Sequence, residues 1–164
     1  MNPCLAFLVV LHLHNKNKKE EKAMNVPGRN FLLVVGILYV VFGGIAIVTS
    51  FAFLATADYW DRTMPITSGM SWSVRYGIAL IFALYHIFIG IMGISNRVHI
   101  EKAAFLRTLG FIDIVCVIAN AVFLAVIWGG IFGGASATFG LIVGLVLPVL
   151  YLVGAYKNLS ALQR

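Results

Sequence analysis

The sequence predicts an all-α membrane protein, a bundle of four transmembrane helices. The chain has 164 residues, of which 61% are hydrophobic and 11% are charged, whereas soluble domains are about 25% charged. Four nearly uncharged runs approach or exceed the ~20 residues that a helix needs to cross a bilayer. The runs are unbroken and do not alternate, so they predict helices and not the strands of a membrane barrel.

The chain divides into a short tail and one membrane domain. Residues 1–23 contain an apolar run, "CLAFLVVLHLH", that is too short to span a bilayer, and the charged run "NKNKKEEK" follows it. A secretory signal has its positive charge before the apolar core. Two interpretations stay open: the tail is disordered or lies on the membrane surface, or translation starts at Met24. The membrane domain then covers residues 24–164, with predicted spans at 31–57, 76–95, 105–128 and 138–156.

The distribution of basic residues predicts the orientation. Ten of the twelve Lys and Arg residues lie before the first span, around the second loop or after the fourth span, and only Arg62 and Arg75 lie in the first loop. The positive-inside rule therefore places both termini in the cytoplasm of a cell-membrane protein. The outer interface then receives aromatic anchors, which are Trp60, Trp72 and Trp128. The glycosylation sequon "NLS" at 158–160 would face the cytoplasm, so we interpret it as a chance match.

Small residues form faces on three of the spans. Close helix packing in lipid depends on such residues, because no hydrophobic force draws helices together there. We therefore expect a tightly packed bundle and not a cofactor pocket. The packing positions are Gly36, Gly43, Ser50 and Ala57 in span one, Ala79, Ala83, Gly90 and Gly93 in span two, and Gly140 and Gly144, continued by Pro148, Tyr151 and Ala155, in span four.

Span three carries polar residues on one face instead. Asp113 and Asn120 share that face, and a short loop makes spans two and three antiparallel neighbours. At 1.5 Å per residue, His86 and Asp113 are both about 15 Å deep, so we expect them to face each other. The same register predicts contacts along the two spans: Gly90 with Gly110, Ala83 with Cys116 or Val117, and Ala79 with Asn120.

Two segments of the chain resemble two others. "LVVGILYVV" aligns with "RTLGFIDIV", which matches Gly36 with Gly110, and "GIMGISNR" aligns with "YLVGAYKN", which matches Gly93 with Gly154. The matched segments run in the same direction through the membrane. The fold is then either a duplicated helical hairpin or a bundle whose apolar helices resemble each other by composition alone.

Other chemistry is not indicated. The sequence has no His/Glu pair at metal-ligand spacing, no phosphate-binding glycine loop and no serine with a base, so we expect no enzyme, metal or cofactor. Cys4 and Cys116 are interpreted as unpaired thiols. Asp58, Asp61 and Arg62 in the first loop are expected to be solvated charges. The basic residues form no stripe with exposed aromatic residues, which excludes nucleic acid as a partner.

The glycine-rich spans and the closing motif "LPVLYLVGAYKN" resemble uncharacterised four-helix integral membrane proteins of bacteria. The resemblance covers residues 24–158, and it implies fold and location only.

Two functions are compatible with these observations. The first is a structural or accessory module of the lipid bilayer, as a homo-oligomer or bound to a partner membrane protein through its small-residue faces. The alternative is a proton-linked small-solute transporter or channel that uses Asp113, His86 and Asn120, because ionisable groups in mid-membrane often bind protons. Under the first function, the same residues form an interhelical polar contact that fixes helix register.

Overall fold

The computed structural model describes residues 26–64, 70–127 and 135–162, with side chains for 26–64, 70–123 and 141–162. Every element in these ranges is helical, and the fold is an all-α bundle of four long helices. They are α2 (Arg29–Ala55), α4 (Trp72–Ser95), α5 (Ala103–Ile127) and α6 (Ala135–Leu162). Two short elements join them, α3 (Ala57–Thr63) and the 3-10 helix η1 (Ile100–Lys102).

The four long helices correspond to the four predicted spans, and each is long and apolar enough to cross a membrane. The bounds differ from the predicted ones by up to six residues, and the ends of the first and last helices show why. The first helix stops at Ala55, because the backbone leaves helical geometry at Thr56. The last helix continues to Leu162, since the segment after Tyr156 contains no helix-breaking residue.

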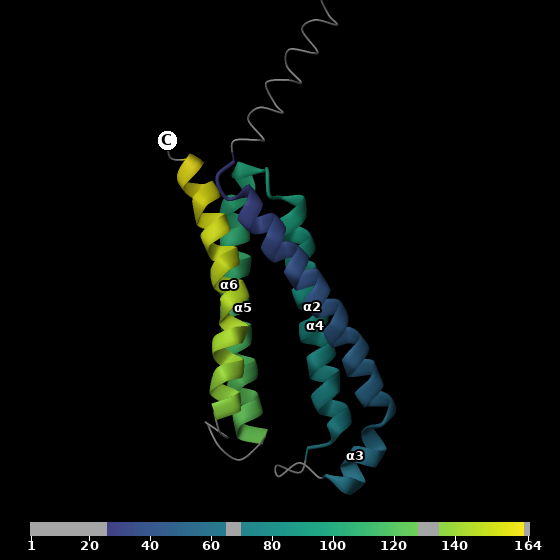
Figure 1. Cartoon of the computed structure of the whole chain (residues 1–164). Coiled ribbons are helices and arrows are strands. Elements are labelled where there is room, and N and C mark those ends of the chain that lie inside the picture. Colours follow the sequence, from purple (N-terminus) through teal and green to yellow (C-terminus); the bar gives the residue numbers. More distant parts are fainter. Residues whose placement is uncertain (1–25, 65–69, 128–134, 163–164) are drawn as a thin grey trace, which may run out of the picture.

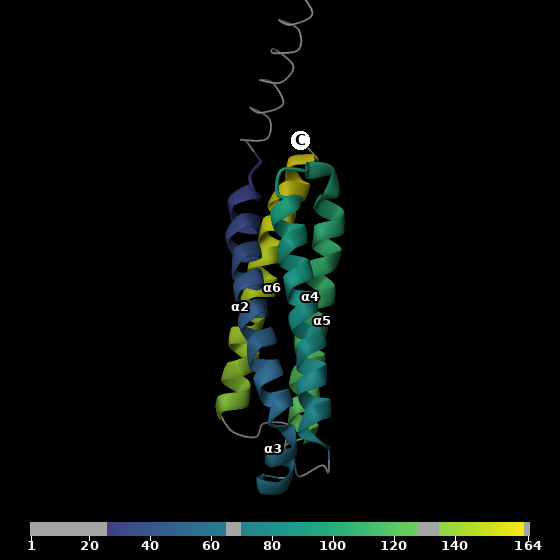
Figure 2. The ribbon, with the colours of Figure 1, turned by 90° about the vertical axis from the view of Figure 1, so that its right-hand side faces the viewer.

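The helices form two hairpins. The first hairpin is α2 with α4 and the second is α5 with α6, and each pair has extensive contacts along its length. Figure 1 shows the hairpins close together where α2 begins and α6 ends, and further apart toward α3. We call these the terminal end and the loop end. Figure 2 shows the four helices nearly parallel. Contacts between hairpins are made mainly by α2 with α6, whereas α4 and α5 touch sparsely.

The predicted register between spans two and three is therefore wrong. Gly90 does not meet Gly110; a methyl group added at Gly90 would lie 2.7 Å from the carbonyl oxygen of Gly36 in α2. Gly110 instead lies against Tyr151 and Leu152 of α6. The short loop makes α4 and α5 antiparallel, but it does not decide which helices pack closely. That choice follows from the glycines of α2 and α4, which let these two backbones approach each other.

A second predicted contact also differs from the structure, whereas a third, between Ala79 and Asn120, stays a prediction. Ala83 packs against Gly43 of α2 and not against Cys116 or Val117, since a methyl group at Gly43 would lie 3.0 Å from the Ala83 carbonyl oxygen. Val117 contacts Gly144 of α6. The pairing of Ala79 with Asn120 is not found among the described contacts.

Most of the small-residue faces are used inside the bundle. Among the predicted packing positions, Ala79 and Gly144 are half-buried, and Gly140 lies outside the residues whose side-chain surroundings are described. The others are buried: Gly36, Gly43, Ser50, Ala57, Ala83, Gly90, Gly93, Pro148, Tyr151 and Ala155. These buried positions therefore pack inside the bundle, and the binding of a partner helix stays a prediction.

The two hairpins pack through equivalent positions. Gly36 contacts Gly90 in the first hairpin, and their sequence matches Gly110 and Tyr151 contact each other in the second. Extending both alignments without gaps matches Gly43 with Val117 and Ala83 with Gly144. Gly43 contacts Ala83 in the first hairpin, and their matches Val117 and Gly144 contact each other in the second. This agreement is what a duplicated hairpin predicts.

The loop end contains an aromatic cluster. Trp72, at the start of α4, is buried against Ala57, with Trp60, Met70, Tyr76 and Phe123 around it. Trp60 and Trp72 thus lie at the predicted membrane interface, and Trp128 falls outside the described residues.

Asp61 at the loop end differs from the prediction that it is a solvated charge. Its carboxylate accepts a hydrogen bond from the backbone N–H of Trp72 at 2.8 Å, which satisfies one of the free donors at the start of α4. Asp58 and Arg62 are exposed, as predicted.

Candidate functional site

The Asp113 carboxylate, on α5, is completely buried in the middle of the bundle. One of its oxygens, Oδ2, accepts a hydrogen bond from the hydroxyl of Tyr39 on α2. Tyr39 is itself only 2% exposed. The two residues occupy matched positions of the repeat, each three residues after the matched glycines Gly36 and Gly110. Tyr39 belongs to the first hairpin and Asp113 to the second, so this hydrogen bond lies where the two hairpins face each other.

His86 of α4 approaches the other carboxylate oxygen. Its Nε2 lies 3.3 Å from Oδ1 of Asp113, and its side chain is 31% exposed. The orientation does not make a hydrogen bond, since Oδ1 has no hydrogen-bond partner among the described residues. The contact is an ion pair when His86 is protonated. His86 and Asp113 therefore lie next to each other, as their equal depth predicted, although the predicted contacts above and below them are wrong.

Aromatic rings complete this group, which we call the central cluster: Tyr39, Tyr85, His86, Asp113 and Tyr151. The Tyr39 ring lies 5.5 Å from the His86 ring and 6.0 Å, edge-on, from the Tyr151 ring, and Tyr85 lies 6.3 Å from His86. All four long helices therefore contribute a polar side chain. The hydroxyls of Tyr85 and Tyr151 are buried, and no described residue bonds to them.

The central cluster can hold the hairpins in one register. An ionisable group in mid-membrane costs several kcal/mol unless it is paired, and Asp113 is paired with groups from two other helices. Interhelical polar contacts in membrane proteins average about 0.6 kcal/mol and reach about 1.7 kcal/mol. The cluster therefore contributes more to the specificity of the arrangement than to its total free energy.

Asn120 lies outside the cluster. It is half-buried, about 10 Å along α5 from Asp113 at 1.5 Å per residue, and it has no hydrogen bond to a described residue. Cys116, between the two on the same helix, is a free, half-buried thiol.

Tyr39 and Tyr85 were missed by the sequence analysis. A signal for Tyr39 exists in the repeat, because the alignment that matches Gly36 with Gly110 places Tyr39 on Asp113. No comparable pattern singles out Tyr85, since an aromatic residue next to His86 is unremarkable in an apolar span.

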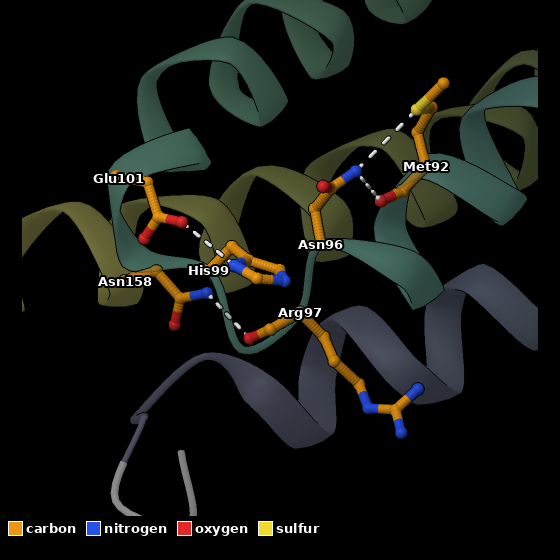
Figure 3. Close-up of polar contacts among 6 residues, drawn as sticks. All are labelled: Met92, Asn96, Arg97, His99, Glu101 and Asn158. Atoms are coloured by element: carbon orange, nitrogen blue, oxygen red, sulfur yellow. Dashed lines mark hydrogen bonds and ion pairs between the residues drawn. The ribbon is translucent and has the colours of Figure 1, made fainter. Parts of the chain in front are cut away.

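A second polar group lies at the terminal end (Figure 3). Asn158 of α6 is completely buried; its Oδ1 accepts from the backbone N–H of Gly28 at 2.7 Å, and its Nδ2 donates to the carbonyl oxygen of Arg97 at 3.3 Å. One side chain therefore ties together the start of α2, the loop after α4 and the end of α6. Because both amide atoms are engaged, the sequon at this residue is compatible with a chance match.

The rest of the α4–α5 loop is held locally. Asn96 donates to the carbonyl oxygen of Met92 at 2.9 Å, and His99 lies 2.9 Å from the carboxylate of Glu101.

Among the described residues, no group of three or more His, Cys, Asp or Glu side chains could hold a metal ion. Comparisons with protein-family models, curated proteins and solved structures found no match. The resemblance of the closing motif to bacterial four-helix proteins therefore stays a prediction.

Proposed function

We propose that this multi-pass membrane protein is a structural or accessory module of the cell membrane, without enzymatic activity and with both termini in the cytoplasm. The observation that supports the proposal is the complete burial of Asp113 between Tyr39 and His86. Its partners come from two different helices, and both of these belong to the other hairpin. The carboxylate thus serves a contact between hairpins.

The chemistry of the bilayer explains why such a contact is useful. Lipid tails are as apolar as leucine, so apolar side chains alone do not determine how two hairpins associate. A buried polar contact penalises every arrangement that leaves the carboxylate unpaired. We therefore expect the two hairpins to keep one arrangement, so that the protein presents the same surface to the lipid at all times.

A partner membrane protein or a second copy of the chain belongs to this proposal. Either would contact the lipid-facing surface, because the buried glycines of α2 and α4 are already covered. Gly44 and Gly77 are the open glycines on these two helices, with no other atom within 4 Å of an added methyl group.

The experiment compares Asp113→Asn with Asp58→Asn, whose carboxylate is exposed. We expect Asp113→Asn to lower the unfolding temperature in detergent, because the substitution replaces the carboxylate that accepts from Tyr39 and lies against His86; interhelical polar contacts in membrane proteins contribute about 0.6–1.7 kcal/mol. Asp58→Asn should leave it unchanged.

The same proteins in vesicles test the transporter alternative. We expect no proton flux above that of empty vesicles for the parent chain. Flux that Asp113→Asn abolishes, at an unchanged unfolding temperature, would replace the structural proposal by the transporter.

A further inference from the structure

We propose that the terminal end of the bundle binds the phosphate group of an anionic phospholipid between Arg29, at the start of α2, and Arg97, just after α4. The proposal concerns a different part of the molecule from the central cluster and does not depend on the function proposed above.

The two arginines have buried donors that the described residues leave unpaired. Nε of Arg29 and Nε of Arg97 are each buried without a hydrogen-bond partner there. Both side chains are only half-buried overall, so part of each remains exposed. A buried donor without an acceptor is unfavourable, and a phosphate oxygen is the acceptor that a guanidinium fork fits best.

The structure holds the two arginines at one junction. The Asn158 amide bonds both to Gly28, which precedes Arg29, and to Arg97 itself. Figure 3 shows the Arg97 side chain directed away from His99 and Glu101 and toward the α2 ribbon. The contact of Ile94 with Gly36 confirms that the end of α4 lies against α2.

The charge around this junction favours an anion. Lys157 lies with Nζ 4.1 Å from the Phe31 ring, and Arg107 lies 5.8 Å from the Tyr156 ring, so these cations rest on aromatic rings. Glu101 is the only acidic side chain described at this end, and it is engaged by His99. The start of α2 has no acidic residue in its first turn, and a helix N-terminus adds partial positive charge.

The depth of the site selects a lipid as the source of the phosphate. Arg29 begins one membrane-spanning helix and Arg97 immediately follows another, so both lie where headgroups meet the hydrocarbon. Nη1 of Arg97 bonds back to the carbonyl oxygen of Ile94 at 3.1 Å, which directs the guanidinium toward the bilayer. Basic pockets between helices at this level are typical sites for anionic headgroups.

The test measures lipid binding to the full chain by native mass spectrometry in detergent, with phosphatidylglycerol, phosphatidylcholine and inorganic phosphate as separate probes. We expect phosphatidylglycerol to bind in preference to phosphatidylcholine, and each of Arg29→Gln and Arg97→Gln to weaken its binding about five- to tenfold. The matched control is Arg107→Gln, which removes a charge at the same end and should weaken binding less than about twofold.

Three results would overturn the proposal. Equal weakening by all three substitutions would indicate diffuse surface charge. Unchanged binding of phosphatidylglycerol to Arg29→Gln and Arg97→Gln would show that these residues do not form the site. Full competition by inorganic phosphate would indicate a site for a free anion and not for a lipid. If a glutamine variant does not fold, Arg29→Lys and Arg97→Lys keep the charge but lose the guanidinium fork. These variants should weaken binding measurably, and unchanged affinity would again overturn the proposal.

Discussion

The hydroxyl of Tyr39 donates a hydrogen bond to the carboxylate of Asp113 across the interface between the two hairpins. The two residues occupy the same position of the internal repeat, so one repeat supplies the donor and the other the acceptor. Two ionised carboxylates at this point would repel each other, whereas a hydroxyl facing a carboxylate supplies one donor and one acceptor. The combination of Tyr39 with Asp113 therefore makes the contact between hairpins favourable.

Replacement of Tyr39 by Phe tests the value of this hydrogen bond. We expect Tyr39→Phe to lower the free energy of unfolding by about 1–3 kcal/mol, because the substitution leaves Oδ2 of Asp113 without its donor. Thermal unfolding in detergent would measure the change. Tyr59→Phe removes the same hydroxyl from a side chain that is 62% exposed and serves as the control; equal effects of the two substitutions would contradict a special role for Tyr39.

Glycine substitutions test the packing of the first hairpin. In Gly90→Ala the new methyl group would lie 2.7 Å from the Gly36 carbonyl oxygen, so the backbones must separate, and overpacking of this kind costs about 1–3 kcal/mol. Gly77→Ala adds the same group to the same helix at a position with no atom within 4 Å. We expect a lower unfolding temperature for Gly90→Ala only. A similar decrease for both would show that alanine destabilises α4 itself, and not its packing against α2.

The Asn158 side chain offers a test at the terminal end. Asn158→Ala removes both of its hydrogen bonds, whereas Asn158→Asp keeps the acceptor for Gly28 and loses the donor to Arg97. In hydrogen exchange we expect Asn158→Ala to accelerate exchange at residues 26–31 and 96–99, and Asn158→Asp to act mainly on 96–99. The control Asn30→Ala, at an exposed position, should change the exchange rate of neither segment. Unaltered exchange in Asn158→Ala would show that the two Asn158 hydrogen bonds are dispensable.

The fold could be predicted from the sequence because membrane insertion depends on local properties. Each span is recognisable from its own length and apolar composition, which is why the four helices lie where the sequence predicts them. Helix α3 was not anticipated, since its stability depends on Trp60 and Trp72 packing together across the first loop. Asp61 was misjudged for the same reason: its partner, the Trp72 N–H, lies eleven residues further along the chain.

The candidate site could be predicted only in part. Depth along a helix follows from counting residues, so His86 and Asp113 could be placed at one level, and the structure places them 3.3 Å apart. Lateral neighbours do not follow from counting. Gly90 was therefore assigned to Gly110, whereas it packs on Gly36, and the Tyr39 hydroxyl beside Asp113 was missed.

The sequence by itself determined the number of long, membrane-spanning helices, their bounds to within six residues, and the depth of each polar side chain, because these depend on hydropathy and on the rise of one helix. Only the tertiary structure decided that α2 pairs with α4, that α5 pairs with α6, and that Tyr39 bonds to Asp113. Apolar surfaces associate with lipid as readily as with each other. The choice among lateral arrangements therefore depends on close backbone approach at glycines and on a few buried polar contacts, which form only when all four helices are together.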